Sequence, residues 1–92
     1  MKIGEFTLVN KAGLHARPAT IFIKEMRKFK SNVIIEKGDK RANGKNLIEV
    51  LSLGADYGDR ITIIVEGEDE EEAFKRIHDL INNELPKYDN IG

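Results

Sequence analysis

Residues Ala12–Phe29, AGLHARPATIFIKEMRKF, decide the fold because they join a strand-like segment to an amphipathic helix. Gly13 lies in the connecting loop, and Pro18 suits the first helical turn, where its missing N–H is harmless. Apolar side chains then recur at steps of three and four residues, which is the spacing of one helix face. These side chains are Ala19, Phe22, Ile23, Met26 and Phe29. The stretch predicts a helix over residues 16–29 with one buried face.

The segments that follow and precede this helix predict the rest of the fold. Strand formers, rich in β-branched and apolar residues, occupy the segments 3–10, 32–37 and 60–66, and the hairpin signal Gly38-Asp39 predicts a short returning strand over 40–42. Two further segments with helical apolar spacing, 47–53 and 70–85, predict a short helix and a long one. The order β-α-β-β-α-β-α predicts an α+β fold, in which three helices cover one face of a four-stranded, mainly antiparallel sheet.

Length and composition exclude several classes of function. A chain of 92 residues leaves little room for a deep cavity, so any chemistry should lie at the surface. The net charge of −1 gives no general attraction to nucleic acid or to membranes, and the absence of cysteine excludes thiolate chemistry. No signal peptide or membrane-spanning run is visible, so we expect a cytoplasmic protein. We expect a single domain over residues 1–88 and a flexible tail over 89–92.

A histidine and an arginine lie together at the predicted start of the first helix. The first four N–H groups of a helix have no partner inside it, so the amides of Ala16 and Arg17 are predicted to be free to bind an anion. The Arg17 guanidinium adds a charged donor for phosphate oxygens. A neutral imidazole is nucleophilic, so the arrangement suits a phosphoryl group carried on His15. An ordinary cap or surface histidine is the alternative that these residues alone leave open.

Two separated motifs resemble one known family. Residues 13–19, GLHARPA, resemble the active-site signature of HPr, the histidine-containing phosphocarrier of the bacterial phosphoenolpyruvate:sugar phosphotransferase system. Residues 43–54, NGKNLIEVLSLG, resemble the second-helix signature of the same family, and the order of elements also agrees. The resemblance covers essentially the whole chain, and it implies the open-faced β-sandwich of that family.

The resemblance implies a phosphoryl carrier rather than an enzyme. His15 would accept a phosphoryl group on Nδ1 from phosphorylated Enzyme I, which obtains it from phosphoenolpyruvate. It would then donate the group to the EIIA components of sugar uptake, while Arg17 stabilises the phosphate. No cofactor and no metal are expected, and a monomer suits a carrier that presents one face to successive partners.

A docking surface for these partners is expected around the first and second helices. Five large apolar residues within seven positions of the second helix cannot all face one core, so some are expected to be exposed as a docking patch. Basic side chains of the first helix would surround the patch and attract an acidic partner. The expected docking residues are Thr20, Lys24, Arg27, Leu47, Ile48 and Leu51. A well-buried short helix and a merely solvated basic face are the alternatives.

Asn46 departs from the family pattern, because many HPr proteins carry a serine at this place. In Gram-positive bacteria a dedicated HPr kinase/phosphorylase phosphorylates that serine. Asparagine has no hydroxyl, so this control, including the corepressor role in carbon catabolite repression, is expected to be absent. Asparagine is also a favourable helix N-cap, and Glu49 stands where a capping box would place its second member. A regulatory HPr-like binding module is the alternative function, whereas the balanced charge argues against an RNA-binding domain.

Overall fold

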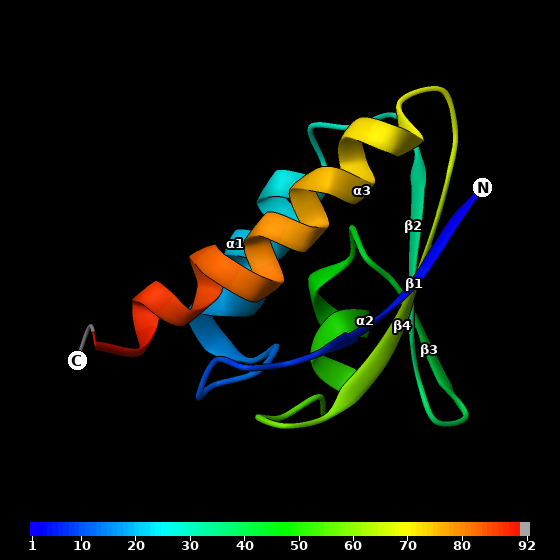
Figure 1. Cartoon of the computed structure of the whole chain (residues 1–92). Coiled ribbons are helices and arrows are strands. Elements are labelled where there is room, and N and C mark those ends of the chain that lie inside the picture. The colour runs from blue at the N-terminus through cyan, green and yellow to red at the C-terminus, as the bar shows by residue number, and fades with distance from the viewer. Residues whose placement is uncertain (91–92) are drawn as a thin grey trace.

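Four strands form one sheet, and the helices pack on one of its faces (Figure 1). The computed structural model describes residues 1–90. The strands are β1 (Lys2–Thr7), β2 (Asn32–Lys37), β3 (Lys40–Asn43) and β4 (Arg60–Glu66). The helices are α1 (Ala16–Met26), α2 (Leu47–Ser52) and α3 (Glu70–Asp79), and α3 continues into a π-helix, η1 (Leu80–Glu84), and a 3-10 helix, η2 (Leu85–Asn90).

The sheet has the order β1-β4-β2-β3, and all of its pairings are antiparallel. Only β2 and β3 are joined by a hairpin, and β4, one of the two inner strands, pairs with two strands that are not its neighbours in sequence. Along β4, Ile61, Ile63 and Val65 are buried, whereas Thr62 and Ile64 are partly exposed on the other face. This alternation is the period-two pattern of a sheet that is covered on one side. The predicted α+β architecture is therefore confirmed.

The core fills the space between the sheet and the helices. Each large apolar side chain removed from water there stabilises the fold by roughly 1.5–3 kcal/mol. The fully buried side chains with the largest volumes include Phe22 and Met26 of α1, Ile35 and Ile63 of the sheet, and Ile77, Leu80 and Ile81 of the C-terminal helices.

None of the helices within residues 1–90 is long and apolar enough to cross a membrane.

The first helix is shorter than predicted, because it ends at Met26 rather than at Phe29. The amides of Lys28 and Phe29 donate to the carbonyls of Glu25 and Met26, three residues back, at 3.2 and 3.1 Å. Such tightened turns satisfy the last carbonyls of a helix while the chain leaves its axis. Phe29 still packs against the core, which explains why the apolar spacing of the sequence extends to it.

The C-terminal segment differs from the prediction more strongly. The helical path continues beyond Leu85 through Pro86, which lies in the first turn of η2, where a missing N–H is tolerated. The side chain of Asp89 accepts a hydrogen bond from the amide of Lys11 at 2.9 Å. The predicted tail over 89–92 is therefore corrected at its first two residues, Asp89 and Asn90, which belong to η2. Its last two residues, 91 and 92, lie outside the described residues.

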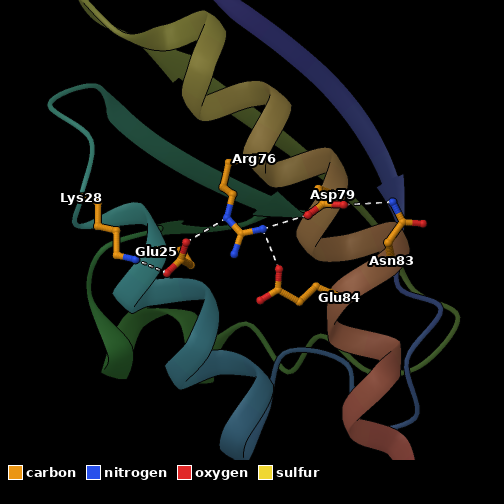
Figure 2. A network of polar contacts seen from close by, with 6 residues as sticks. All are labelled: Glu25, Lys28, Arg76, Asp79, Asn83 and Glu84. Carbon is orange, nitrogen blue, oxygen red and sulfur yellow. Dashed lines mark hydrogen bonds and ion pairs between the residues drawn. The ribbon is translucent and has the colours of Figure 1, made fainter.

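A network of charged side chains centred on Arg76 joins α3 to α1 (Figure 2). The Nε atom of Arg76 donates to Glu25 at 2.8 Å, and Nη1 donates to Asp79 at 2.9 Å and to Glu84 at 2.6 Å. The hydrogen bond that Arg76 donates to Glu84, and then the one it donates to Glu25, raises the pKa of Arg76. Lys28, followed by Arg76, lowers the pKa of Glu25. The network thereby fixes the helix that carries the candidate site onto the C-terminal helices.

Candidate functional site

His15 is the N-cap residue of α1 and lies at the surface. Its backbone is extended, with φ −123° and ψ 163°, and its side chain makes no capping hydrogen bond. The imidazole is 37% exposed. The preceding residue, Leu14, is fully buried, and its amide donates to the carbonyl of Ala55 at 2.9 Å. The loop is thus anchored by a buried neighbour while the histidine ring remains accessible to a partner.

Gly13 allows the loop to pass close to the chain that follows α2. It has a φ of +58°, and a Cβ atom at this position would collide with the carbonyl oxygen of Ala55. Only glycine fits both this close approach and this left-handed conformation. The side chain of the buried Asn10 donates to the Gly13 carbonyl at 2.9 Å. These contacts fix the path of the chain immediately before His15.

Ala16 has a φ of +49°, which is uncommon for a residue with a Cβ atom. This left-handed conformation costs of the order of 1–2 kcal/mol and therefore represents strain next to His15. The first α-helical hydrogen bond, from the Ala19 amide to the His15 carbonyl, is long at 3.4 Å. Within residues 1–90, no backbone carbonyl from outside the helix accepts a hydrogen bond from the amides of Ala16 or Arg17. Both amides are therefore available as donors at the helix start.

The exposed Arg17 lines an open hollow at the same helix start. Part of its wall comes from η2, the segment that the sequence predicted to lie partly in a tail. Its lining thus brings together the loop before His15, the first turn of α1 and the C-terminal helix. The lining residues are Lys11, Ala12, Ala16, Arg17, Pro18, Tyr88 and Asp89.

Asp56 contacts His15 and was not predicted from the sequence. The His15 Nε2 atom lies 2.6 Å from the Asp56 Oδ1 atom, although the two residues are 41 positions apart. A carboxylate only accepts hydrogen bonds, so in the neutral ring this contact places the hydrogen on Nε2 and the lone pair on Nδ1. An imidazole nitrogen accepts a phosphoryl group through its lone pair, and this contact leaves that lone pair on Nδ1. Within residues 1–90, no three acidic or histidine side chains gather closely enough to hold a metal ion.

The predicted docking residues divide by their exposure. Ile48 is 76% exposed, and Leu47 and Leu51 are 36% and 38% exposed, while Val50 and Leu53 of the same helix are buried. The predicted exposure of these three apolar side chains is therefore confirmed. The helix that carries them contacts α1.

The polar members of the predicted docking set lie on α1 or at its end. Lys24 is exposed, and Arg27 is exposed with its Nε atom donating to the Lys45 carbonyl at 3.0 Å. Thr20 is half-buried, and its hydroxyl donates to the Ala16 carbonyl at 3.3 Å. Because α1 and α2 are neighbours, the basic and apolar residues belong to adjoining elements.

Asn46 caps α2 as predicted, because its side chain accepts a hydrogen bond from the Glu49 amide at 3.1 Å. The reciprocal half of the capping box is absent. The Glu49 carboxylate accepts instead from the amide of Asn43 at 2.9 Å, and the Asn46 amide donates to the Asn43 carbonyl at 3.0 Å. Asn46 is therefore a structural N-cap of α2.

The family model for the PTS HPr component phosphorylation site matches residues 3–83 of the chain. The chain belongs to the HPr family. HPr-like protein Crh of Bacillus subtilis (strain 168) is 39% identical over 75 residues, which are 82% of this chain and 88% of that protein. The multiphosphoryl transfer protein of Salmonella typhimurium is 40% identical over 80 residues, which cover 84% of this chain and 21% of that much longer protein.

Solved structures of HPr proteins have the same fold. HPr of Thermoanaerobacter tengcongensis is 41% identical to this chain. The two structures superpose with a TM-score of 0.90, over 92% of this chain and 96% of the other. The phosphocarrier protein HPr of Bacillus anthracis is 34% identical and superposes with a TM-score of 0.85, over 88% of this chain and 96% of the other. Crh of Bacillus subtilis crystallised as a dimer with a swapped domain; it is 39% identical, with a TM-score of 0.73 over 82% of this chain and 86% of the other.

Proposed function

We propose that this HPr-family protein carries a phosphoryl group on the Nδ1 atom of His15. It accepts the group from phosphorylated Enzyme I, which is charged by phosphoenolpyruvate, and donates it to EIIA components of bacterial sugar uptake. It acts as a stoichiometric relay between proteins, as a cytoplasmic monomer. The observation that carries this proposal is an accessible imidazole whose Nε2 atom is occupied by Asp56, so that Nδ1 is left with the lone pair.

The helix start supplies the donors that a phosphoryl group on His15 needs. The oxygens of the phosphoryl group would accept hydrogen bonds from the free amides of Ala16 and Arg17 and would face the partial positive charge of the helix N-terminus. The Arg17 guanidinium would add a charged hydrogen bond. Because these donors lie at the surface, the same group remains accessible to the next protein in the relay.

The exposed apolar side chains of α2 and the basic side chains of α1 support docking at this face. Burial of Leu47, Ile48 and Leu51 would stabilise a complex, whereas Lys24 and Arg27 would accelerate the encounter with an acidic partner. A relay needs complexes that form and separate quickly. A small apolar centre with a charged rim suits such short-lived contacts.

A regulatory HPr-like binding module is the second candidate function. The identity of 39% to HPr-like protein Crh favours it. Asn46 argues against the serine-dependent form of such regulation, because it offers no hydroxyl to a kinase. The two functions differ in one property that can be measured, which is the uptake of a phosphoryl group by His15.

Phosphorylation by Enzyme I tests the proposal. The protein is incubated with phosphoenolpyruvate and an Enzyme I whose own HPr serves as a positive control, and its intact mass is measured. We expect an acid-labile gain of one phosphoryl group, which His15→Ala abolishes. His78→Ala is the matched control, because His78 is an exposed histidine on α3 that packs against Phe6 and Phe74. Uptake by the positive control but not by this protein would favour the regulatory module.

A further inference from the structure

The contact between Asp56 and His15 results from the way two loops are joined. The Leu14 amide donates to the Ala55 carbonyl at 2.9 Å, so the residues that follow each of them lie side by side. This places the Asp56 carboxylate 2.6 Å from Nε2, the ring nitrogen that the proposed function leaves unphosphorylated. Among the described side chains of residues 1–89, no other forms a hydrogen bond with the His15 ring.

The backbone of Asp56 is itself held in place. Its amide donates to the Asp59 carboxylate at 2.8 Å, and that carboxylate also pairs with Lys37 at 3.1 Å. The hydrogen bond from the Asp56 amide, and then that from Lys37, lowers the pKa of Asp59 and keeps this carboxylate charged. The amide of Gly58 donates to the Leu8 carbonyl at 2.8 Å, which ties the loop to the end of β1. The exposed Asp56 side chain therefore projects from a fixed loop.

We propose that Asp56 is a positioning residue for phosphoryl transfer through His15. It holds the hydrogen on Nε2, so that the lone pair stays on Nδ1, and it faces the positive charge that the ring acquires on phosphorylation. The inference rests on the proposed function of His15. The same logic operates where an aspartate orients the histidine of a hydrolytic triad.

The transfer step balances without moving a proton. The Nδ1 lone pair forms the bond to phosphorus, and the bond between phosphorus and the leaving atom of the donor breaks, with its electron pair remaining on the donor. The His15 ring keeps its hydrogen on Nε2 and becomes a phosphorylated imidazolium. A carboxylate on that N–H forms a charge-assisted hydrogen bond, which is stronger than a neutral one. When the group passes on, the electron pair of the N–P bond returns to Nδ1.

The other charged groups near the ring do not replace Asp56. Asp59 interacts electrostatically with His15, but its carboxylate already accepts a hydrogen bond from the Asp56 amide and pairs with Lys37. Arg17 is a cation and cannot accept the hydrogen from Nε2. Asp56 is thus the acceptor that the fold offers to this atom.

Variants at Asp56 test the inference in two ways. Asp56→Ala removes the acceptor and Asp56→Asn removes its charge, while Asp39→Asn makes the same charge change at an exposed site in the β2–β3 turn. The tautomer of His15 is measured first, by ¹⁵N NMR of the unphosphorylated protein labelled at histidine. The rate of phosphoryl uptake from phosphorylated Enzyme I is measured next, in a single turnover.

We expect the wild type to carry its ring hydrogen on Nε2, and Asp56→Ala to give a mixture of the two tautomers. The uptake rate of both Asp56 variants should fall about three- to tenfold, because the carboxylate is largely exposed and acts through the ring. Asp39→Asn should change neither quantity.

The outcomes separate this inference from the function on which it rests. If the wild type is phosphorylated but Asp56→Ala keeps its tautomer or its rate, the positioning role of Asp56 is wrong. A slower rate with an unchanged tautomer also overturns it, because weaker partner docking would then explain the loss. If the wild type takes up no phosphoryl group, the carrier function fails, and the Asp56 role in transfer fails with it, whichever tautomer the spectrum shows.

Discussion

Arg76 and Arg17 differ in how the fold surrounds the same kind of side chain. Arg76 is 25% exposed and is bound by three carboxylates, whereas no carboxylate within residues 1–90 forms an ion pair with the exposed Arg17. The paired arginine fixes α1 against the C-terminal helices. The unpaired one lies at a strained helix start, where its charge is free to bind an anion. The comparison teaches that this fold surrounds with carboxylates an arginine that joins its helices and, within residues 1–90, pairs no carboxylate with the arginine at the proposed phosphoryl site.

Replacement of Arg17 should have the largest effect on function. We expect Arg17→Ala to slow phosphoryl uptake roughly 10–100-fold, because a charged donor to the transferred group is lost. The free energy of unfolding should change by less than about 0.5 kcal/mol, since the side chain is exposed. Single-turnover uptake and urea unfolding measure the two quantities. Arg41→Ala, at an exposed arginine of β3, is the control. A normal uptake rate for Arg17→Ala would show that Arg17 does not bind the transferred group.

Replacement of Arg76 should give the opposite result. Arg76→Met removes the cation that pairs with Glu84 and one of the two that pair with Glu25, so we expect a loss of roughly 1–3 kcal/mol in the free energy of unfolding. This range lies below the value for a fully buried pair, because water reaches a quarter of the Arg76 side chain. Phosphoryl uptake at a temperature where the variant is folded should remain normal. Unfolding in urea with Arg41→Met as the control measures the loss, and unchanged stability would show that the network in Figure 2 contributes little.

Asp69 extends the paired region beyond the C-terminal end of α1, to Lys30 and Ser31. It accepts hydrogen bonds from the Ser31 hydroxyl and from the amides of Lys30 and Ser31. These hydrogen bonds, above all the one from the Ser31 hydroxyl, lower the pKa of Asp69 to about 2. A lowered pKa in the folded state stabilises the protein above the ordinary value of 3.8. That stability disappears as the pH falls from 3.8 towards about 2.

The melting temperature between pH 5 and pH 2 tests this contribution. We expect Asp69→Asn to lower the melting temperature at pH 5 and to show a smaller further decrease at low pH than the wild type. Glu71→Gln, an exposed acidic residue in the first turn of α3, is the control. Identical pH profiles for Asp69→Asn and the wild type would contradict the assignment.

The strain at Ala16 should give the smallest effect. Ala16→Gly should change the free energy of unfolding by less than about 0.5 kcal/mol, because relief of the left-handed conformation offsets the greater freedom of glycine in the unfolded chain. Lys24→Gly, in the exposed interior of the same helix, should lose about 1 kcal/mol. Urea unfolding of the two variants side by side makes the comparison. A loss at Ala16 as large as that at Lys24 would show that Ala16 is not strained.

The sequence predicts most of the fold and the centre of the site. Alternating residues such as Ile61 and Ile63 define β4 to the residue, and the motif around His15 locates the helix start. Three features depend on contacts that no local pattern contains. Asp56 reaches His15 through a hydrogen bond between loops, Ala16 adopts a conformation that its residue type disfavours, and η2 is held by a bond from the Lys11 amide to Asp89. Each is set by tertiary structure, so each was missed or placed wrongly.

The atom that carries the phosphoryl group is the central claim, and NMR of the phosphorylated protein tests it most directly. Protein labelled with ¹⁵N at histidine is phosphorylated with phosphoenolpyruvate and Enzyme I, and the coupling between phosphorus and nitrogen identifies the bonded atom. The account predicts the phosphoryl group on Nδ1 of His15, with the hydrogen retained on Nε2 opposite Asp56. A phosphoryl group on Nε2 of His15, or on His78, would contradict it.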